Sequence, residues 1–242
     1  YSEANYETNI SDFQLVSYIL GRCATVDEVK AEIARVHIHG FDPRSSTVHW
    51  RFAEPSGRQI VLEIIDGKCI FYENNLGVLT NSPSFDWQLT NLNNYVNLLP
   101  GRTEPHTLGN MSLSSFGGGS AMIGLPGDFT PPSRFVRAAF FQNTAPQKPD
   151  AEGSVFTAFH ILGSMEIPIG AQFPVDETPA DIPSATQCTC VTDMSGLKFY
   201  YRSMYDGGIR CIDLKEIDFK KIGLKSEPLV PSKKEFVHHI RF

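Results

Sequence analysis

One stretch of consecutive apolar residues constrains the fold of this chain more than any other feature. It comprises Ile60-Val61-Leu62 and Ile64-Ile65, inside the run 59–65. Neighbouring side chains of a β-strand point to opposite faces, so this run leaves no polar face for solvent. Such a strand is typical of a sheet that is covered on both sides. The rest of the chain must therefore supply two cover layers.

The residues around this stretch predict a β-meander. Apolar and β-branched residues recur with a period of two, and turn residues separate the runs, with Asp66-Gly67 as the strongest hairpin signal. The predicted strands are Thr47–Ala53, Gln59–Ile65, Cys69–Glu73 and Gly77–Thr80.

Helical periodicity precedes and follows the meander. Ser11 or Asp12 can cap the first helix, which ends at Gly21, and Thr25 can cap the second. Pro131 and Pro132 suit the first turn of a later helix that begins after Thr130. The predicted helices are Phe13–Leu20, Thr25–Arg35, Phe85–Leu99, a helix from Pro131 through Gln142, and Glu152–Leu162.

The C-terminal part returns to strands, which we predict at Ala185–Thr192, Leu197–Met204, Ile209–Leu214 and Phe236–Phe242. The order is thus helices, strands, helices and strands. A four-layer α-β-β-α sandwich in the α+β class satisfies this order and gives each sheet two cover layers, and other α+β arrangements also fit. We find no linker and predict a single domain over residues 1–242.

Composition and charge exclude several classes of function. The chain has 242 residues, of which 41% are hydrophobic and 20% charged, with a net charge of −6. Nucleic acids and anionic membranes require a basic surface, so we predict neither as a partner. No apolar run is long enough to span a membrane. The N-terminus has neither an initiator Met nor the features of a signal peptide, so we expect it to follow a cleavage, a truncation or a part not shown.

Several familiar catalytic and cofactor motifs are missing. The chain has no G-x-S-x-G elbow, no H-E-x-x-H pair and no G-x-G-x-x-G loop, and Leu125 stands where a Walker A loop needs Lys. We predict no metal site and no cofactor. His49 and His160 lie among apolar residues and are predicted to be hydrogen-bonded core histidines. The five cysteines are predicted to be buried free thiols.

Two local motifs are candidates for chemistry. Asn81 lies in Leu79-Thr80-Asn81-Ser82-Pro83, between a predicted strand and a predicted helix. This motif is either an ordinary turn or a site where the Asn81 amide faces a reacting carbonyl as an oxyanion donor. Arg134 follows the Gly124–Pro132 loop at a helix N-terminus, where a cation is disfavoured. It is therefore either solvated or held in place for a purpose.

Four stretches together resemble one protein family, in order and with matching spacing. They are Gly77–Tyr95, which contains Thr80-Asn81-Ser82-Pro83; Gly124–Arg137, with the letters GLPGDFTPPSRFVR; Leu162-Gly163-Ser164; and Tyr200–Arg210, with the letters YYRSMYDGGIR. They are similar to the choloylglycine hydrolase family, which includes bile salt hydrolases and penicillin V acylases. The resemblance covers nearly the whole chain.

The resemblance implies a fold, a reaction and site residues. The fold is the α-β-β-α sandwich of N-terminal-nucleophile hydrolases, and the reaction is cleavage of linear amide C–N bonds. The family's nucleophile is a cysteine at residue one, whose own α-amino group acts as the base. The family's motif asparagine and arginine match Asn81 and Arg134. The resemblance adds no cofactor, and the residues that bind the substrate stay unknown.

The sequence also departs from the family. Tyr1 occupies the first position, and none of the five cysteines matches the family's nucleophile. We therefore expect the segment that carries Cys, Arg and Asp to be absent, so that these 242 residues are the C-terminal portion of an amidohydrolase and inactive alone. The motifs give no prediction of localisation.

The resemblance leaves several alternatives for substrate and assembly. The expected substrates are glycine- or taurine-conjugated bile acids. The alternatives are penicillin V or another acyl amide such as an acyl-homoserine lactone, and, in a different class, a non-catalytic fragment that needs its N-terminal segment. The loop His39–Thr47 is a candidate pocket wall. The Pro100–Gly127 loop resembles the family's assembly region, which implies a homo-oligomer, expected to be a tetramer.

Overall fold

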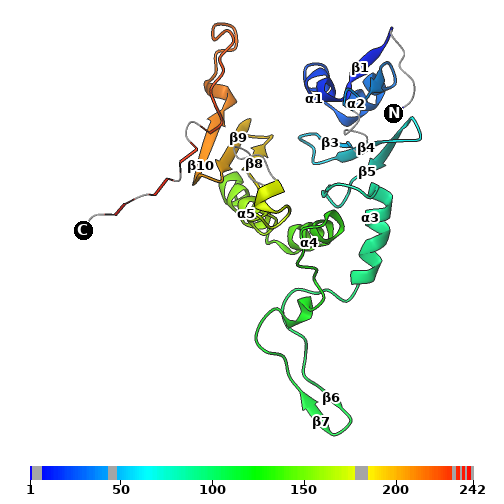
Figure 1. Cartoon of the computed structure of the whole chain (residues 1–242), viewed down its shortest axis with the longest axis vertical. Coiled ribbons are helices and arrows are strands. Elements are labelled where there is room, and N and C mark those ends of the chain that lie inside the picture. Colours follow the sequence, from blue (N-terminus) through cyan, green and yellow to red (C-terminus); the bar gives the residue numbers. More distant parts are fainter. Residues whose placement is uncertain are drawn as a thin grey trace. The chain divides into compact units, whose positions relative to one another are not determined.

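The computed structural model describes residues 1, 7–42, 48–177, 185–230, 233–234, 236–237 and 239–240. Its chain divides into two compact units, Tyr1–Thr144 and Ala145–Phe242 (Figure 1). Each unit has its own sheet and its own helices. The single domain expected from the sequence stays a prediction.

The first unit contains seven strands, four α-helices and two short 3-10 helices among its described residues. In chain order they are β1 (Asn9–Ser11), α1 (Asp12–Leu20), α2 (Val26–Ile33), β2 (His37–His39), β3 (Trp50–Ala53), β4 (Gln59–Ile65), β5 (Lys68–Glu73), α3 (Phe85–Asn91), η2 (Leu92–Tyr95), β6 (His106–Leu108), β7 (Met111–Leu113), η3 (Ser120–Met122) and α4 (Pro131–Thr144).

The apolar run 59–65 is β4, the central strand of the antiparallel sheet β3-β4-β5. The hairpin between β4 and β5 turns at Asp66 and Gly67, with φ angles of 48° and 74°, the left-handed pair that a two-residue hairpin requires. The connection from β3 to β4 contains the residues Pro55-Ser56-Gly57. The predicted meander is thus confirmed for its first three strands.

Both faces of β4 are buried, as the sequence predicts. Ile60 and Leu62 pack with apolar residues of α1 and α2 on one face. Val61 packs on the opposite face with Phe85 of α3 and Phe135 of α4. Figure 1 shows α1 and α2 on one side of this sheet and α3 and α4 on the other. Within this unit, both cover layers of the sheet are therefore helical.

The first two helices begin where the sequence predicts. Ser11 caps α1 and Thr25 caps α2, and each cap is a reciprocal capping box, completed by Gln14 and Glu28 respectively. In α2, Val26, Val29 and Ile33 face the core. This helix ends two residues before the predicted Arg35.

The predicted fourth strand at Gly77–Thr80 is wrong. The side chain of the buried Asn74 makes hydrogen bonds here in place of those between neighbouring strands. Gly77 N donates to Asn74 Oδ1 at 2.9 Å, and Asn74 Nδ2 donates to the carbonyl of Val78 at 3.1 Å. Gly77 has a φ of 75°, outside the strand region. Side-chain hydrogen bonds thus satisfy the backbone here and leave the following residues as a loop.

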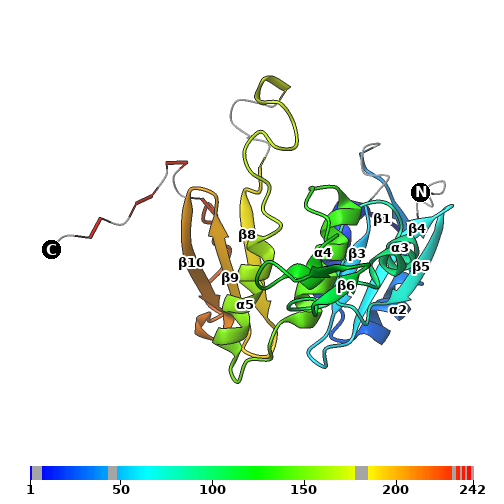
Figure 2. The same cartoon turned by 90° about the horizontal axis from the view of Figure 1, so that it is seen from below.

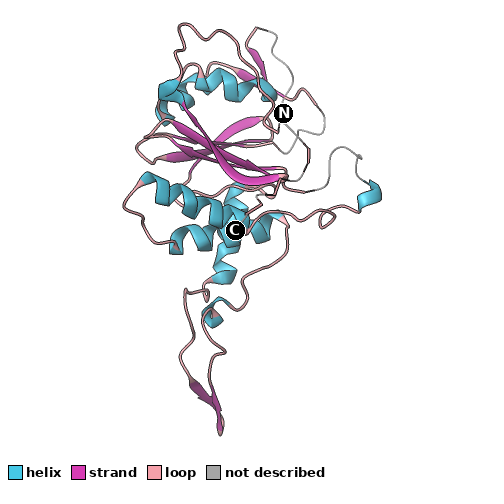
Figure 3. Cartoon of the chain, turned by 90° about the vertical axis from the view of Figure 1, so that its left-hand side faces the viewer, coloured by secondary structure: helices cyan, strands magenta, loops and turns pink. Residues whose placement is uncertain are grey.

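Two further predictions need correction. The predicted helix Phe85–Leu99 is α-helical only to Asn91 and then tightens into η2, where Asn93 Nδ2 donates to the carbonyl of Thr90 at 2.9 Å. The long loop after it contains a hairpin that the sequence did not reveal, β6–β7, which turns at Gly109 with a φ of 58° (Figure 3).

The second unit is one antiparallel sheet of order β10-β9-β8 with a helix beside it (Figure 2). Three of the four strands predicted for this unit are confirmed, with shifts of their ends. Its elements are α5 (Ala151–Gly163), η4 (Val175–Glu177), β8 (Cys188–Asp193), β9 (Lys198–Ser203), β10 (Asp206–Asp213) and η5 (Leu214–Glu216).

Parts of two predictions lie outside the described residues. The candidate pocket loop 39–47 includes residues 43–47, and the predicted final strand includes residues 238, 241 and 242, none of which is described. Residues 236, 237, 239 and 240 have no regular secondary structure. In the described part of the chain, no helix combines the length and apolarity that crossing a bilayer requires.

Candidate active site

The structure brings the two candidate residues, Asn81 and Arg134, into direct contact. Nη2 of Arg134 donates to Oδ1 of Asn81 at 2.6 Å, although 53 residues separate them in sequence. Asn81 lies in the loop before α3, and Arg134 lies in the first turn of α4. A second hydrogen bond joins the two motifs, because the Thr80 hydroxyl donates to the carbonyl of Pro131 at 3.1 Å. The motifs therefore form one site.

Arg134 is held on a second side by the loop before α4. Its Nε donates to the carbonyl of Phe129 at 3.0 Å. That loop is in turn organised by the buried Arg137, whose Nη1 donates to the carbonyls of Pro126 and Asp128 at 2.7 and 2.6 Å. Arg134 is thus held by hydrogen bonds on two sides, and its role in the site stays a prediction.

The charge of Arg134 has no carboxylate partner among the described residues. Burial lowers the pKa of its guanidinium from the ordinary value, and repulsion from Arg137 lowers it further. A cation that is half buried and unpaired favours negative charge in its surroundings. The site is thus electrostatically prepared for an anion.

Asp128 fixes the start of α4. Its carboxylate accepts the Thr130 N–H at 2.9 Å, the Thr130 hydroxyl at 2.5 Å and the Ser133 hydroxyl at 2.7 Å. These hydrogen bonds lower the pKa of Asp128 to about 2, those from the Thr130 and Ser133 hydroxyls being the largest cause. The helix begins at Pro131, as predicted. Its first turn is organised by the carboxylate of Asp128, which is hydrogen-bonded to Thr130 and Ser133.

The backbone of Asn81 is held from the side of α3. The carbonyl of Asn81 accepts Nε2 of Gln88 at 3.3 Å, and Gln88 is only 2% exposed. Asn81 itself is exposed. A buried amide therefore holds the backbone of a residue whose side chain faces solvent.

The contact with Arg134 determines which end of the Asn81 amide is available. Arginine only donates, so its partner atom on Asn81 is the oxygen, and the amide NH₂ points elsewhere. Among the described residues, Nδ2 of Asn81 has no hydrogen-bond partner. An exposed, oriented NH₂ group beside an unpaired guanidinium is an arrangement that can stabilise an oxyanion.

Two supporting residues, Gln88 and Arg137, were not singled out from the sequence. Gln88 follows Phe85 by three residues and precedes Leu92 by four, on a face that is otherwise apolar. A polar side chain at such a position is a usable signal, because a buried amide needs a partner. Arg137 lies next to the buried Val136 and gave no comparable signal, since its partners are backbone carbonyls of the loop before α4.

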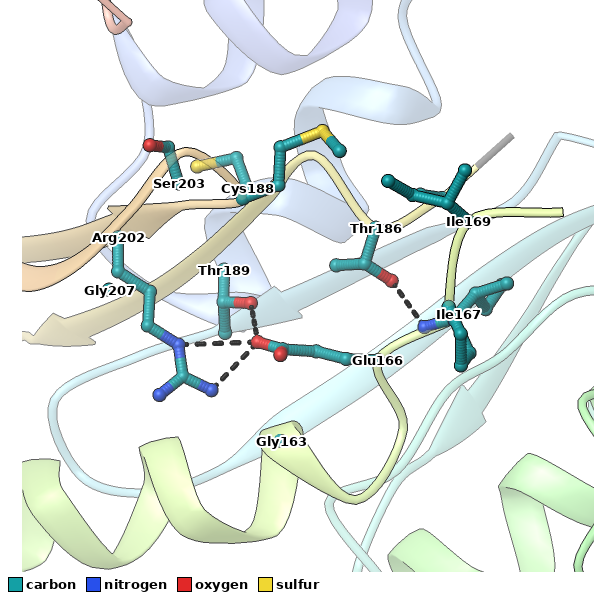
Figure 4. Close-up of a pocket in the computed structure, with 13 residues that line it drawn as sticks. Gly163, Glu166, Ile167, Ile169, Thr186, Cys188, Thr189, Arg202, Ser203 and Gly207 are labelled. Atoms are coloured by element: carbon teal, nitrogen blue, oxygen red, sulfur yellow. Dashed lines mark hydrogen bonds and ion pairs between the residues drawn. The ribbon is translucent and has the colours of Figure 1, made fainter. Parts of the chain in front are cut away.

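The second unit contains a cavity of about 560 Å³ beside β8 and β9 (Figure 4). Glu166 lies in it, and Oε1 of Glu166 accepts Nη2 of Arg202 at 2.7 Å and the Thr189 hydroxyl at 2.7 Å. These charges neutralise each other. Burial and a hydrogen bond with Cys190 raise the pKa of Cys188, another lining residue, to about 11, so its thiol stays protonated near neutral pH. The cavity therefore lacks an activated nucleophile among these residues.

The remaining cysteines and histidines differ partly from expectation. All five cysteines are free, but Cys69, Cys190 and Cys211 are exposed, so the prediction that they are buried is wrong for these three. His160 is exposed, contrary to the prediction, because it lies on the outer face of α5. His49 is half buried and hydrogen-bonded, as predicted. In the residues that the structure describes, no three His, Cys, Asp or Glu gather in a metal-binding group.

Comparison with known proteins decides the family. A family model described as linear amide C–N hydrolases, choloylglycine hydrolase family, matches residues 1–227. The chain belongs to the choloylglycine hydrolase family. A bile salt hydrolase/transferase of Clostridium perfringens is 35% identical over 223 residues, which cover 89% of this chain and 66% of that protein. A penicillin V acylase of Pectobacterium atrosepticum is 31% identical over 228 residues, which cover 85% and 53% respectively.

The fold agrees with this membership. The crystal structure of a mutant conjugated bile acid hydrolase from Clostridium perfringens matches with a TM-score of 0.83 and 30% identity. The match covers 100% of this chain and 73% of that one. The predicted fold class, α+β of the N-terminal-nucleophile hydrolase type, is confirmed. The chain spans 66% of the length of the Clostridium perfringens bile salt hydrolase/transferase.

Proposed function

We propose that the protein hydrolyses linear amides and that Asn81 and Arg134 form its oxyanion side. One observation carries this proposal: the 2.6 Å hydrogen bond by which Arg134 orients the Asn81 amide. The Nδ2–H group of Asn81 donates to the oxygen of the tetrahedral intermediate, and the guanidinium charge stabilises the same oxygen through space. The family membership supports amide hydrolysis as the reaction.

The attacking group comes, in this proposal, from an N-terminal cysteine outside the 242 residues. None of the five cysteines here is hydrogen-bonded to Asn81 or Arg134 in the described part of the chain. The thiolate adds to the amide carbon, the C–N bond breaks, and the amine leaves after taking a proton from the α-ammonium group. Water then hydrolyses the thioester to the free acid and regenerates the thiolate.

The proposed substrates are bile acids conjugated to glycine or taurine. The similarity to the bile salt hydrolase/transferase supports this choice, and the similarity to the penicillin V acylase supports the alternative, penicillin V. An acyl-homoserine lactone is a further alternative that presents the same kind of acyl amide.

Turnover by the protein expressed from its native start codon tests the substrate. Released amine is measured with taurocholate, glycocholate, penicillin V and an acyl-homoserine lactone, and kcat/KM is compared. The bile acid conjugates are expected to give the highest value. A higher value for penicillin V would replace the substrate assignment and keep the reaction, whereas no amide hydrolysis at all would overturn the function.

The 242-residue chain alone provides a second comparison. The proposal expects it to fold without hydrolysing any of these substrates, because it lacks the attacking thiolate. If the native protein were equally inactive, the non-catalytic interpretation would replace this one. Turnover by the chain alone would show that one of its own cysteines is the nucleophile.

We also propose that the protein assembles into a homo-oligomer, expected to be a tetramer, through the region around β6 and β7. This region carries large apolar side chains that are mostly exposed: Leu108, Met111, Phe116 and Ile123 are 68%, 65%, 102% and 77% exposed. Exposed apolar residues gathered around one hairpin are typical of a protein–protein interface.

A further inference from the structure

We propose that His49 and Glu63 form a hydrogen-bonded clamp that positions the turn carrying Asn81, and that they are positioning residues for the amidase site. This inference rests on the proposed function for its kinetic consequence. Its structural part, the fixing of the Asn81 turn, stands on contacts that do not involve a substrate.

The first half of the clamp is Glu63, a carboxylate in the middle of the apolar strand β4. Glu63 is only 5% exposed. Its Oε1 and Oε2 accept the backbone N–H of Phe85 at 3.0 and 3.1 Å. Phe85 is the first residue of α3, so the carboxylate lies at the positive end of that helix. Glu63 therefore fixes the point at which the turn enters α3.

The second half is His49, which precedes β3. Its Nδ1 lies 3.1 Å from Oε1 of Glu63, and its Nε2 is hydrogen-bonded to the carbonyl of Thr80. Both ring nitrogens of His49 are therefore engaged, one by the side chain of Glu63 and the other by the backbone just before Asn81.

The two partners of the clamp bracket the Asn81 turn. Thr80 directly precedes Asn81, and Phe85 follows Asn81 by four residues and ends the turn. His49 and Glu63 hold these two points and are bonded to each other, so the ends of the turn are fixed relative to one another. A cavity of about 160 Å³ is lined by this pair together with residues 82–84 of the turn.

Burying the clamp costs solvation free energy, which indicates that the pair does more than stabilise the fold. Polar side chains that are nearly buried lose hydration, and apolar residues of similar size are often at least as stabilising. Apolar side chains here would leave the Phe85 N–H and the Thr80 carbonyl without these partners and would not fix their separation. The pair therefore contributes geometry to the Asn81 turn that apolar packing cannot.

Variants of the native protein test this inference. His49→Phe removes both ring nitrogens, Glu63→Gln replaces one carboxyl oxygen with an amide NH₂, and the double variant removes the clamp. Tyr18→Phe is the matched control, because it removes a 2.6 Å side-chain hydrogen bond to Glu32 in the same unit without touching the Asn81 turn. In the wild type, the ¹⁵N signals of His49 are expected to show that both ring nitrogens are hydrogen-bonded.

The expected kinetic result separates positioning from simple loss of stability. A small displacement of a reacting group typically lowers the rate by about tenfold to a hundredfold, so kcat is expected to fall by that factor in both single variants while KM changes by less than about threefold. Residues that act as one unit are not additive, so the double variant should lose about as much as the worse single variant. The control should keep the kcat of the wild type.

An NMR measurement distinguishes an error in the proposed clamp from an error in the proposed function. The side-chain NH₂ signal of Asn81 is expected to move in both clamp variants and to stay in the control, whether or not the protein hydrolyses an amide. An unmoved Asn81 signal, an equal shift in the control, or a His49 ring with a nitrogen that is not hydrogen-bonded would each overturn the clamp. The ring measurement needs no variant and decides the case even where His49→Phe does not fold.

Discussion

At the scale of single residues, the shape of the Arg134 guanidinium matters as much as its charge. It donates through two nitrogens in different directions, to the Phe129 carbonyl and to Oδ1 of Asn81. A lysine has the charge but donates from one atom at the end of a flexible chain, so it cannot reproduce both bonds at the same geometry.

Arg134→Lys is therefore expected to lower kcat of the native protein by about tenfold or more, because the Asn81 amide is no longer held by a fixed partner. KM is expected to change little, since the loss is in the transition state. Steady-state kinetics on taurocholate measures both. Arg35→Lys, at a surface ion pair with Glu32, is the control and should leave kcat unchanged. Equal kcat in both variants would show that charge alone suffices.

The sequence predicted these residues to different degrees for physical reasons. Asn81 and Arg134 lie in motifs whose residue types could be interpreted locally. For Glu63, the sequence itself indicates a buried partner, since a carboxylate inside a strand buried on both faces requires one. The partner itself, a backbone N–H of α3, depends on the tertiary fold. His49 was expected to be hydrogen-bonded, but no local pattern reveals that it reaches Thr80.

At the scale of elements, the start of α4 depends on Asp128. The folded-state pKa of Asp128 is lowered to about 2 from an ordinary value of 3.8, by hydrogen bonds from Thr130 and Ser133. A depressed carboxylate pKa contributes stability that is complete above the unfolded-state pKa and is lost as the pH falls through the folded-state pKa.

Asp128→Asn is thus expected to be less stable than the wild type by a constant amount above about pH 4, and the difference is expected to shrink as the pH falls towards about 2. Urea unfolding at a series of pH values measures the free energy of unfolding of both proteins. A difference that persists unchanged at the acid end of this range would mean that the carboxylate charge contributes nothing to the helix start.

A second prediction at this scale concerns the stability of the core between α3 and α4. Phe135 of α4 is fully buried against Phe85, with ring centroids 6.0 Å apart. Phe135→Ala is expected to reduce the free energy of unfolding by about 3 to 5 kcal/mol, because it creates a cavity between α3 and α4. Phe156→Ala on α5 is the control, since Phe156 is 48% exposed. Similar losses in the two variants would place Phe135 outside the core.

The elements show where local sequence determines structure and where it does not. Reciprocal capping boxes and the Asp66-Gly67 turn fix α1, α2 and the β4–β5 hairpin through nearest neighbours, and these predictions are confirmed. The predicted strand after Asn74 and the predicted continuation of α3 to Leu99 are wrong for the same reason. In both segments, asparagine side chains hydrogen-bond to the backbone in place of regular main-chain hydrogen bonds.

At the scale of the whole molecule, the exposed β6–β7 hairpin leads to a prediction about assembly. Leu108→Asp with Met111→Asp places charges on its apolar face, where they oppose burial in an interface. The native protein is expected to be a tetramer by light scattering, and the double variant a smaller species with its fold intact by circular dichroism. A variant with the same mass as the wild type would remove this hairpin from the interface.

At this scale, the sequence predicted one fold only through its resemblance to a known family. Periodicity alone left several α+β arrangements open, because apolar strands show that a sheet is covered without showing what covers it. In the first unit, both covers proved to be helical.

The kcat of Asn81→Ala in the native protein tests the central claim, an oxyanion site made by an oriented amide, most directly. The side chain is exposed, so the melting temperature should not change, whereas loss of an oxyanion donor typically lowers kcat by about a hundredfold or more. We predict that loss with taurocholate as substrate. Turnover near that of the wild type, by a folded variant, would contradict the account.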